Sequence, residues 1–368
     1  MRLLIILLSS IYSMGLVANP LPSLGVLETT TSGVSSGGYM AGQLHLAHSE
    51  DVSGVGVVAA GPYRCASGDS IWRYFSPMTA NKNTALDVCM DPCSSIRSWM
   101  PSFMVEWCED QRSPNSALLV SEAKNISVSG NIDSLENLSN DHVYLFTGLK
   151  DRTVISEVVR RTLSFYAQAG VPAKNIRIVE LEDAGHAFVS DNVSDKRKCA
   201  DYGSPYINNC SGYDQAREIL EHLNGKLKPN VSMLMGTMVE FDQSEFLPSN
   251  AFHMSSLAET GYLYVPVECS GGDCSLHIAF HGCKQSAIET RKLTGRLSGT
   301  NFHTHAGYNE VADSNKIVVL YPQLRDRDLT KVSPLNPDSC WDWFGYSSGD
   351  KDYYSHDALQ IKAVKGMI

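Results

Sequence analysis

A serine set between two glycines is the side chain of this sequence that best fits a nucleophile. Gly33-Val34-Ser35-Ser36-Gly37 matches the G-x-S-x-G pattern, and Ser35 alone is in register, because Ser36 has no glycine two residues before it. In that pattern the chain turns sharply from a strand into a helix, which exposes the serine oxygen and presents the next N–H to an oxyanion. The sequence therefore predicts acyl transfer with Ser35 as the nucleophile and the Ser36 N–H in the oxyanion hole. A plain Gly/Ser-rich loop is the alternative.

A serine nucleophile needs a base and an acidic group that orients the base, and both follow along the chain. Asp151 comes after an apolar run and a turn, and His186 follows the next strand-like run behind Ala184-Gly185. The order Ser, Asp, His is that of the α/β-hydrolases. We predict Asp151 as the acid and His186 as the base. Asp183 is the alternative acid, but at three residues before His186 it is badly placed to reach the far ring nitrogen.

A His-Gly turn far downstream would complete the oxyanion hole. His281-Gly282-Cys283 follows the apolar stretch Leu276–Phe280, and such a turn usually supplies the second N–H, here that of Cys283. In the ordinary chain order this turn precedes the nucleophile, whereas here it follows Ser35, which has few residues before it. The motif order therefore predicts a circularly permuted α/β-hydrolase fold, unless the His-Gly turn does no more than end a strand.

These residues need a sheet to position them, and the apolar pattern predicts one. Short apolar runs typical of strands alternate with segments of helical periodicity, which favours an α/β fold with a mainly parallel sheet flanked by helices. The strands are expected within Val26–Thr30, Asp51–Gly61, His142–Thr147, Asn175–Leu181, Tyr262–Val267, Leu276–Phe280 and Ile317–Tyr321, and the helices within Tyr39–Ala47 and Ile155–Ala169. The polar, Ser/Asn-rich stretch Arg112–Asp141 is predicted to be a long surface excursion.

The composition is that of a globular protein. The 368 residues are 43% hydrophobic and 19% charged, which excludes a disordered chain. The formal net charge of −10 argues against nucleic acid or an anionic membrane as the main partner. No internal apolar run reaches the roughly 18 residues that a membrane-spanning helix needs. We expect a single catalytic domain over residues 19–368 that works as a monomer.

The N-terminus has the features of an export signal. Arg2 precedes the apolar run Leu3–Leu8, and Leu16-Val17-Ala18 offers a small-residue cleavage site, so residues 1–18 are predicted to be a signal peptide rather than a buried strand. The ten cysteines support export, because an even number in an oxidising compartment forms disulfides. Close spacing favours the pairs Cys199–Cys210 and Cys269–Cys274. Zinc binding is the alternative, but no CxxC or HxxxH motif accompanies the cysteines.

Together these motifs resemble the single-domain extracellular poly(3-hydroxybutyrate) (PHB) depolymerases, which are circularly permuted α/β-hydrolases. The resemblance lies in Ser32-Gly-Val-Ser35-Ser-Gly-Gly-Tyr-Met-Ala41, Gly148-Leu-Lys-Asp151, Asp183-Ala-Gly-His186, Phe241-Asp-Gln243, Tyr264-Val-Pro266-Val-Glu-Cys269, His281-Gly-Cys283-Lys-Gln285 and Asn336-Pro-Asp-Ser-Cys340-Trp-Asp-Trp343. It implies that Ser35, Asp151 and His186 are the catalytic residues and that Ser36 and Cys283 are the oxyanion donors. It also implies a disulfide between Cys283 and Cys340 and a Trp341 ring that stacks along the bound polyester. We expect no appended C-terminal polymer-binding domain.

Several of these features keep a second interpretation. The Trp341 motif is also typical of a buried core anchor, because large aromatic side chains are usually buried, but the Asn336–Ser339 loop before it favours an exposed Trp341 ring. His303 and His305 resemble a metal-binding pair without a third ligand, and we interpret them as loop residues. The remaining cysteines, Cys65, Cys89, Cys93 and Cys108, allow three pairings.

The sequence thus predicts a secreted serine esterase that hydrolyses ester bonds of PHB, another polyhydroxyalkanoate or their oligomers. Its partner would be the polyester or oligoester, and the reaction needs no metal ion or organic cofactor. A feruloyl or acetyl esterase acting on polysaccharide-linked esters is the main alternative, since only the substrate groove would differ. A secreted binding module of esterase fold is the third possibility, and an intact Ser, Asp, His and His-Gly set argues against it.

Overall fold

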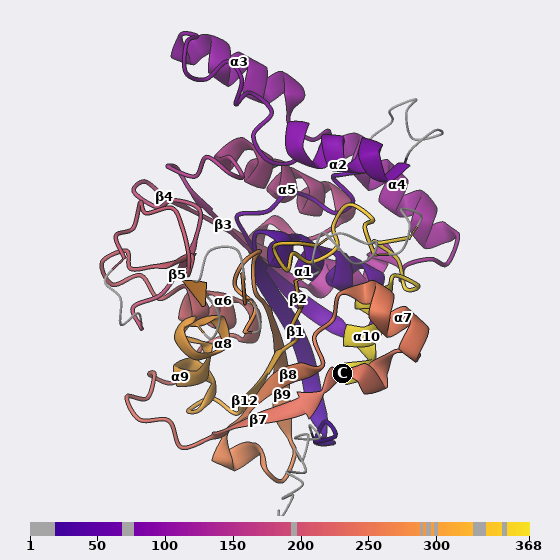
Figure 1. The fold of residues 1–368 in the computed structure, drawn as a ribbon, viewed down its shortest axis with the longest axis vertical. Coiled ribbons are helices and arrows are strands. Elements are labelled where there is room, and N and C mark those ends of the chain that lie inside the picture. Colours follow the sequence, from indigo (N-terminus) through magenta and orange to yellow (C-terminus); the bar gives the residue numbers. More distant parts are fainter. Residues whose placement is uncertain are drawn as a thin grey trace, which may run out of the picture.

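The computed structural model describes residues 19–67, 77–192, 197–287, 290–291, 296–297, 301–326, 336–347 and 352–368. The predicted signal peptide, residues 1–18, lies outside these ranges. Figure 1 shows a central sheet with helices on both sides, which is the predicted α/β architecture.

Eight strands form this sheet in the order β4-β3-β2-β1-β9-β12-β8-β7. The strands are β1 (Val26–Val34), β2 (Val52–Val58), β3 (His142–Gly148), β4 (Ile176–Leu181), β7 (Thr237–Asp242), β8 (Thr260–Val265), β9 (Cys274–Phe280) and β12 (Ile317–Tyr321). All neighbouring strands from β4 to β12 are parallel. β8 runs antiparallel to both of its neighbours, β12 and the edge strand β7. β12 has the sequence Ile-Val-Val-Leu-Tyr and is buried throughout, as is typical of a parallel strand that is covered on both faces.

The central neighbours β1 and β9 come from distant parts of the chain. Their register pairs Ser32 with Ala279 and Gly33 with Phe280. Because the two strands are parallel, their carboxyl ends lie at the same edge, and this edge is where open α/β sheets bind ligands. The chain leaves β1 into Ser35 and leaves β9 into His281, so the two motifs meet here. Their adjacency is what the permuted motif order requires, and the permutation itself stays a prediction.

Helices lie on both faces of the sheet. The helices of one side are α1 (Ser36–Ala47), α4 (Ser116–Val128), α5 (Ser156–Ala169) and α10 (Leu359–Met367), and those of the other are α6 (Gln215–Asn224), α8 (Asn301–His305) and α9 (Tyr308–Ala312). Alternate residues of β3 serve the two sides: Val143 and Leu145 belong to the apolar core with α5, whereas Tyr144 and Phe146 belong to the core with α6. α1 is buried along its whole length, so it has no polar face.

The stretch 112–141 differs from its prediction as a long surface excursion. It contains helix α4 and a 3-10 turn over Leu135–Asn140. Asn115 caps α4 by accepting the Leu118 N–H at 3.1 Å, and Leu119 and Val120 are buried on the inner side of the helix. The polar residues of the helix face outward. The prediction was based on the average composition of the stretch and therefore missed the helical spacing of its few buried apolar residues.

Three further helices complete the described part: α2 (Pro77–Asp87), α3 (Ser102–Arg112) and α7 (Ser249–Ser255). Short strand pairs form between β5 (Phe188–Val189) and β6 (Ile207–Asn208) and between β10 (Thr290–Arg291) and β11 (Arg296–Leu297). α3 extends away from the rest of the molecule at the top of Figure 1. Within the described ranges, every helix is too short or too polar to cross a membrane.

Five disulfides join all ten cysteines. The expected pairs Cys199–Cys210, Cys269–Cys274 and Cys283–Cys340 are present. Of the three pairings left open for the other four cysteines, the structure has Cys65–Cys89 and Cys93–Cys108. The disulfides leave no thiolate for zinc, so the alternative interpretation of the cysteines is wrong.

Candidate active site

Ser35 occupies the turn between β1 and α1, at the carboxyl edge of the sheet. Its backbone has φ 56° and ψ −124°, a conformation that non-glycine residues rarely adopt. The Ser35 N–H donates to the Val58 carbonyl of the neighbouring strand at 2.9 Å, which fixes the turn to the sheet. The side chain is half-buried. A strained serine at a strand-to-helix turn is the geometry of a nucleophile elbow.

The two glycines around Ser35 are required by close contacts. A Cβ on Gly33 would lie 2.2 Å from the Gly37 carbonyl oxygen, and a Cβ on Gly37 would lie 2.4 Å from the His281 carbonyl oxygen. Both distances are far shorter than the non-bonded contacts that Cβ atoms make in proteins, which are essentially never under 3.0 Å. The G-x-S-x-G pattern therefore has a physical cause here, because the turn closes on itself at Gly33 and presses against the end of β9 at Gly37.

Asp151 and His186 form a buried pair on two neighbouring loops of the same edge. His186 Nδ1 lies 2.7 Å from Asp151 Oδ2, and both side chains are buried. Asp151 Oδ1 accepts the Thr153 and Val154 N–H groups at 2.7 and 3.0 Å, which fixes the orientation of the carboxylate. Because the carboxylate can only accept, His186 Nδ1 donates, and Nε2 is the nitrogen left to exchange a proton.

The alternative acid, Asp183, lies apart from the imidazole. Its side chain is exposed and pairs with the Lys150 ammonium on the surface. The loop that carries Asp183 is nevertheless tied to the Asp151 loop, because the Lys150 N–H donates to the Ala184 carbonyl at 3.0 Å. On the far side, the Gly185 N–H donates to the Cys199 carbonyl at 2.9 Å, so the Cys199–Cys210 disulfide helps to hold His186 in place.

The His281-Gly282-Cys283 turn lies beside Ser35, as the sequence predicts for an oxyanion loop. A Cβ on Gly282 would lie 3.4 Å from Ser35 Cβ and 3.1 Å from the Val34 carbonyl oxygen. Ser36 is the first residue of α1, so its N–H has no partner within the helix. The Cys283 N–H likewise donates to no other described residue. Two N–H groups on adjoining turns, neither with a hydrogen-bond partner in the described part of the chain, meet the geometric requirement of an oxyanion hole.

His281 fixes the shape of this turn through both ring nitrogens. Nδ1 lies 2.7 Å from the Gly282 carbonyl oxygen, and Nε2 lies 3.3 Å from the Leu324 N–H. A carbonyl only accepts and an N–H only donates, so the ring carries its proton on Nδ1. Burial lowers the pKa of His281 to about 4, which keeps the ring neutral.

Sequence reasoning assigned no role to Gln285, although it is part of the motif that carries the resemblance. Its Oε1 accepts the Gly282 N–H at 2.6 Å. Its Nε2 donates to the Pro205 and Tyr206 carbonyls at 2.9 and 3.1 Å. Tyr206 also accepts the Phe188 N–H at 2.9 Å, two residues after His186. Gln285 thus links the oxyanion turn to the strand pair beside His186, a contact between distant segments that no local pattern in the sequence indicates.

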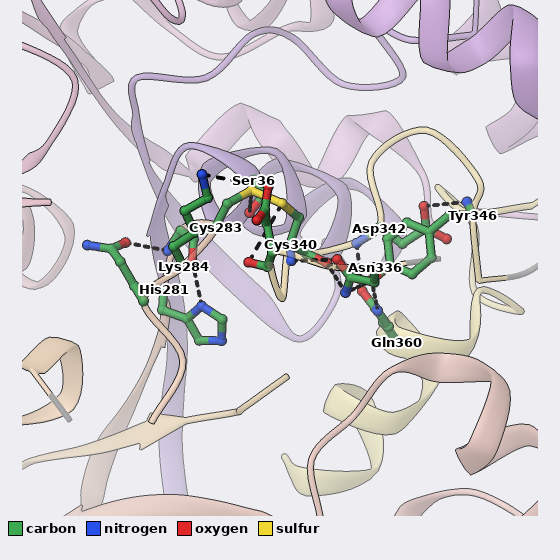
Figure 2. Close-up of a disulfide and its surroundings, with 12 residues drawn as sticks. Ser36, His281, Cys283, Lys284, Asn336, Cys340, Asp342, Tyr346 and Gln360 are labelled. Atoms are coloured by element: carbon green, nitrogen blue, oxygen red, sulfur yellow. Dashed lines mark hydrogen bonds and ion pairs between the residues drawn. A yellow bond between two sulfur atoms is a disulfide. The ribbon is translucent and has the colours of Figure 1, made fainter. Parts of the chain in front are cut away.

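The Cys283–Cys340 disulfide anchors the oxyanion turn from its other side (Figure 2). The Ser36 hydroxyl lies 3.3 Å from Cys283 Sγ, and the hydroxyl is the donor because a disulfide sulfur has no hydrogen. The Lys284 N–H donates to the Asp338 carbonyl at 2.6 Å. Together these contacts hold the first turn of α1, the oxyanion turn and the loop around Cys340 against one another.

The expectation that the Trp341 ring is exposed is wrong. Trp341 is 0% exposed, and its ring packs against those of Phe280 and His281 with centroids 4.7 and 5.5 Å apart. The cause lies in the next residue: Asp342 is buried and its carboxylate accepts N–H groups of residues 345–347, which draws the loop inward. Trp341 is therefore the core anchor of the second interpretation. Its ring packs against Phe280 and His281, the residues that lead into the candidate oxyanion turn.

The histidine pair considered in the sequence is also a structural feature. His303 is buried and stacks on Tyr262 with ring centroids 4.0 Å apart. Among the described residues, no group of three possible metal ligands includes His303 or His305. The prediction that they lie in a loop is wrong, because His303 and His305 belong to helix α8.

Comparison with known proteins gives two long alignments. The chain is 36% identical over 356 residues to a poly(3-hydroxybutyrate) depolymerase of Delftia acidovorans, covering 95% of this chain and 60% of that protein. It is 32% identical over 366 residues to a polyhydroxybutyrate depolymerase of Talaromyces funiculosus, covering 95% of this chain and 92% of the relative. The chain therefore spans about three fifths of the bacterial relative and nearly all of the fungal one. No family model matches it.

Solved structures agree with these alignments. A crystal structure of a PHB depolymerase from Penicillium funiculosum superimposes with a TM-score of 0.75 at 30% identity. A serine-to-alanine variant of a PHB depolymerase complexed with an R3HB trimer superimposes with a TM-score of 0.76, also at 30% identity. Each match covers 95% of this chain and 97% of the solved one. With the sequence, the fold and these relatives in agreement, the chain belongs to the poly(3-hydroxybutyrate) depolymerase family.

Proposed function

We propose that this protein is a secreted serine esterase that hydrolyses the ester bonds of poly(3-hydroxybutyrate), a related polyhydroxyalkanoate or their oligomers. The observation that carries the proposal is the buried Asp151–His186 pair, which lies on the same sheet edge as the strained Ser35 turn. Family membership agrees with the proposal, since the relatives named above are PHB depolymerases.

In this mechanism His186 Nε2 accepts the Ser35 hydroxyl proton while Ser35 Oγ attacks the ester carbonyl carbon. The Ser36 and Cys283 N–H groups stabilise the resulting oxyanion, a contribution of about 10²–10³ in rate for each donor. His186 then protonates the leaving alcohol, and an acyl-enzyme on Ser35 remains. Water, deprotonated by His186, attacks the acyl carbon and releases the hydroxyacid. Asp151 holds the imidazole in the required tautomer and stabilises its charged form.

An exposed aromatic surface at α3 supports a polymer rather than a small soluble ester as the substrate. Trp99 lies in the turn before α3, and Phe103 and Trp107 lie four residues apart on α3; the three side chains are 67%, 67% and 66% exposed. Exposed apolar surfaces of this kind mark interaction sites, and an uncharged aromatic face fits an insoluble aliphatic polyester. We call these three residues the α3 aromatic surface.

α3 also borders a groove that reaches the loop of Asp151, although none of the three aromatic residues lines that groove. A groove of about 410 Å³ runs between α3 and the loop that carries Asp151, with Val105 and Glu109 on one side and Leu149 and Arg152 on the other. The Cys93–Cys108 disulfide ties α3 to the turn before it, so the surface is held in a fixed position. A polymer chain that adsorbs on these aromatic residues would be held on the helix that borders this groove.

Secretion is supported by the five disulfides, which persist in oxidising compartments. It agrees with the predicted signal peptide at residues 1–18 and a mature catalytic domain over residues 19–368. The N-terminal sequence of the protein recovered from the culture medium tests both. Cleavage after Ala18 is expected, and an intact N-terminus in the cell fraction would contradict the proposal.

The decisive experiment measures the clearing of a PHB granule suspension beside hydrolysis of a short chromogenic ester, for the wild type and for Ser35→Ala. Wild-type clearing that Ser35→Ala loses, together with ester hydrolysis, supports both the nucleophile and the polymer substrate. Ester hydrolysis without clearing would assign the enzyme to other esters, such as feruloyl or acetyl groups on polysaccharide. Equal activity of both proteins would exclude Ser35. A wild type that a serine-directed fluorophosphonate fails to label would indicate a binding module instead.

A further inference from the structure

A cluster of two histidines and an aspartate lies at the end of α1 that is remote from Ser35. His48 is the residue at which α1 ends, Asp133 lies in the loop after α4, and His356 lies in the turn before α10. One nitrogen or oxygen atom of each residue lies within 4.8 Å of the other two. The three residues come from distant parts of the chain, so no spacing in the sequence indicates the cluster.

The backbone holds each of the three residues in place. The His48 N–H donates to the Leu44 carbonyl at 2.9 Å, and the Asp133 N–H donates to the Ala47 carbonyl at 3.2 Å. The His356 N–H donates to the Asn131 carbonyl at 3.0 Å, which joins the C-terminal turn to the Asp133 loop. The Glu50 N–H donates to Asp133 Oδ2 at 2.9 Å and leaves Oδ1 facing the histidines. Three backbone hydrogen bonds and one bond to the Asp133 carboxylate therefore hold the cluster in place.

The side chains leave donor atoms available at the centre of the cluster. His356 Nε2 lies 3.0 Å from Asp133 Oδ1, and the His48 and His356 rings lie 4.8 Å apart. His48 Nε2 is buried and has no hydrogen-bond partner among the residues that the structure describes. A buried imidazole nitrogen without a partner is costly unless something outside the protein binds it.

We propose that His48, Asp133 and His356 bind a divalent transition-metal ion, with Zn²⁺ as the best match. Two imidazole nitrogens and one carboxylate oxygen are a donor set that zinc accepts, and the partly exposed His356 and Asp133 leave room for water as a further ligand. Ligand atoms around tetrahedral zinc lie about 3.3 Å apart, so the separations in the cluster, all within 4.8 Å, must close by at most about 1.5 Å. Binding requires a nitrogen lone pair, so the His356 Nε2 proton moves to Nδ1 or is released to solvent.

The site has a structural role that is separate from ester hydrolysis. α1 has twelve residues, which at 1.5 Å per residue place the cluster about 18 Å from the Ser35 turn. The metal ion would join the end of α1 to the turn that leads into α10, and so fasten the C-terminal segment to the centre of the fold. We expect the ion to raise the melting temperature and to leave ester hydrolysis unchanged, whether or not the proposed substrate is correct.

Isothermal titration of the chelator-treated full-length protein with ZnCl₂ tests the site. We expect one Zn²⁺ per chain with a Kd below about 10 µM, and a melting temperature that rises on addition of zinc. His48→Gln and Asp133→Asn should each weaken binding at least about tenfold and abolish the rise in melting temperature. His253→Gln, which changes an exposed histidine on α7, is the matched control and should bind zinc as the wild type does.

Two results would overturn the proposal. One is the absence of binding heat with the wild type at millimolar zinc. The other is zinc binding that persists unchanged in both His48→Gln and His356→Gln, since the ion would then occupy another site. Circular dichroism of each variant confirms that it is folded, and hydrolysis of a soluble ester shows whether zinc acts at His186 instead. Loss of ester hydrolysis on zinc addition in the His48→Gln variant would assign the ion to that site.

Discussion

Gln285 accepts the Gly282 N–H on its side-chain oxygen at 2.6 Å, so its amide helps to set the conformation of the candidate oxyanion turn, together with His281 and the Cys283–Cys340 disulfide. The other end of the same amide bonds to the Pro205 and Tyr206 carbonyls, beside the strand pair that follows His186. Gln285 is therefore a positioning residue for two parts of the proposed machinery at once. Gln285 contacts no reacting atom, so replacing it should change catalysis by shifting the candidate oxyanion turn and the segment beside His186.

Gln285→Leu keeps the size of the side chain and removes all three hydrogen bonds. We expect kcat for a soluble ester to fall about 10- to 100-fold with little change in KM, because a displaced oxyanion turn weakens transition-state stabilisation more than binding. Steady-state kinetics measure both constants. Gln111→Leu, an exposed glutamine on α3, should behave as the wild type. A change in KM alone would contradict a role in the oxyanion turn.

The assignment of the acid can be tested with a matched pair of aspartates. Asp151→Asn preserves the shape of the buried pair but removes the charge, and we expect kcat to fall about 10⁴-fold because the imidazole takes the wrong tautomer. Asp183→Asn changes an exposed carboxylate that pairs with Lys150, and its activity should stay within about twofold of the wild type, as expected for a surface ion pair. The opposite ranking of the two variants would make Asp183 the catalytic acid.

Two glycines of α1 differ in what surrounds them. A Cβ on Gly37 would lie 2.4 Å from the His281 carbonyl, whereas a Cβ on Gly42 has the Tyr166 hydroxyl at 3.7 Å as its nearest neighbour. Gly37→Ala should lower the free energy of unfolding by more than about 2 kcal/mol, because backbone must move. Gly42→Ala should raise it by up to about 1 kcal/mol, the helix-propensity difference. Urea unfolding of both variants measures the two values, and a stable, active Gly37→Ala protein would contradict the close approach.

The α3 aromatic surface should matter for the polymer and not for a small ester. Replacing Trp99, Phe103 and Trp107 together by serine is expected to slow granule clearing at least about tenfold, because apolar contact with the polyester surface is lost. Hydrolysis of a soluble ester should not change. The control replaces three other exposed apolar residues, Val128, Met233 and Met235, by serine. Equal slowing by the control set would mean that no particular surface binds the polymer.

Buried neutral histidines make stability depend on pH. His277 is enclosed between the Thr30 and Ser32 hydroxyls, and burial lowers its pKa from 6.5 to about 3. Between these values the unfolded chain binds a proton that the folded one excludes, so acidification from pH 6.5 lowers the free energy of unfolding by about 1.4 kcal/mol per pH unit for this group. Urea unfolding at pH 7, 6 and 5 should show a shallower fall for His277→Gln than for the wild type. Parallel curves would contradict the prediction.

Local patterns predicted the parts of the molecule whose causes are local. The Ser35 turn needs glycines two residues away on each side, and β3, β4, β9 and β12 are short apolar runs, so both are visible in a single stretch of sequence. The burial of the Trp341 ring depends instead on Asp342, whose carboxylate accepts several N–H groups of its own loop. The sequence pattern of an aromatic residue in a polar loop does not indicate these bonds. The link from Gln285 to Tyr206 joins segments whose proximity only the folded sheet creates.

The pairing of β1 with β9 has a consequence for how the protein is made. The candidate nucleophile turn at Ser35 is synthesised long before the strand that must lie beside it, which ends at Phe280. The central strand pair therefore has a very high contact order, and its loop-closure entropy makes folding slow. A ribosome-bound chain has the proposed nucleophile long before it has the candidate oxyanion turn, so we expect hydrolytic activity to arise only after Cys283 has been synthesised.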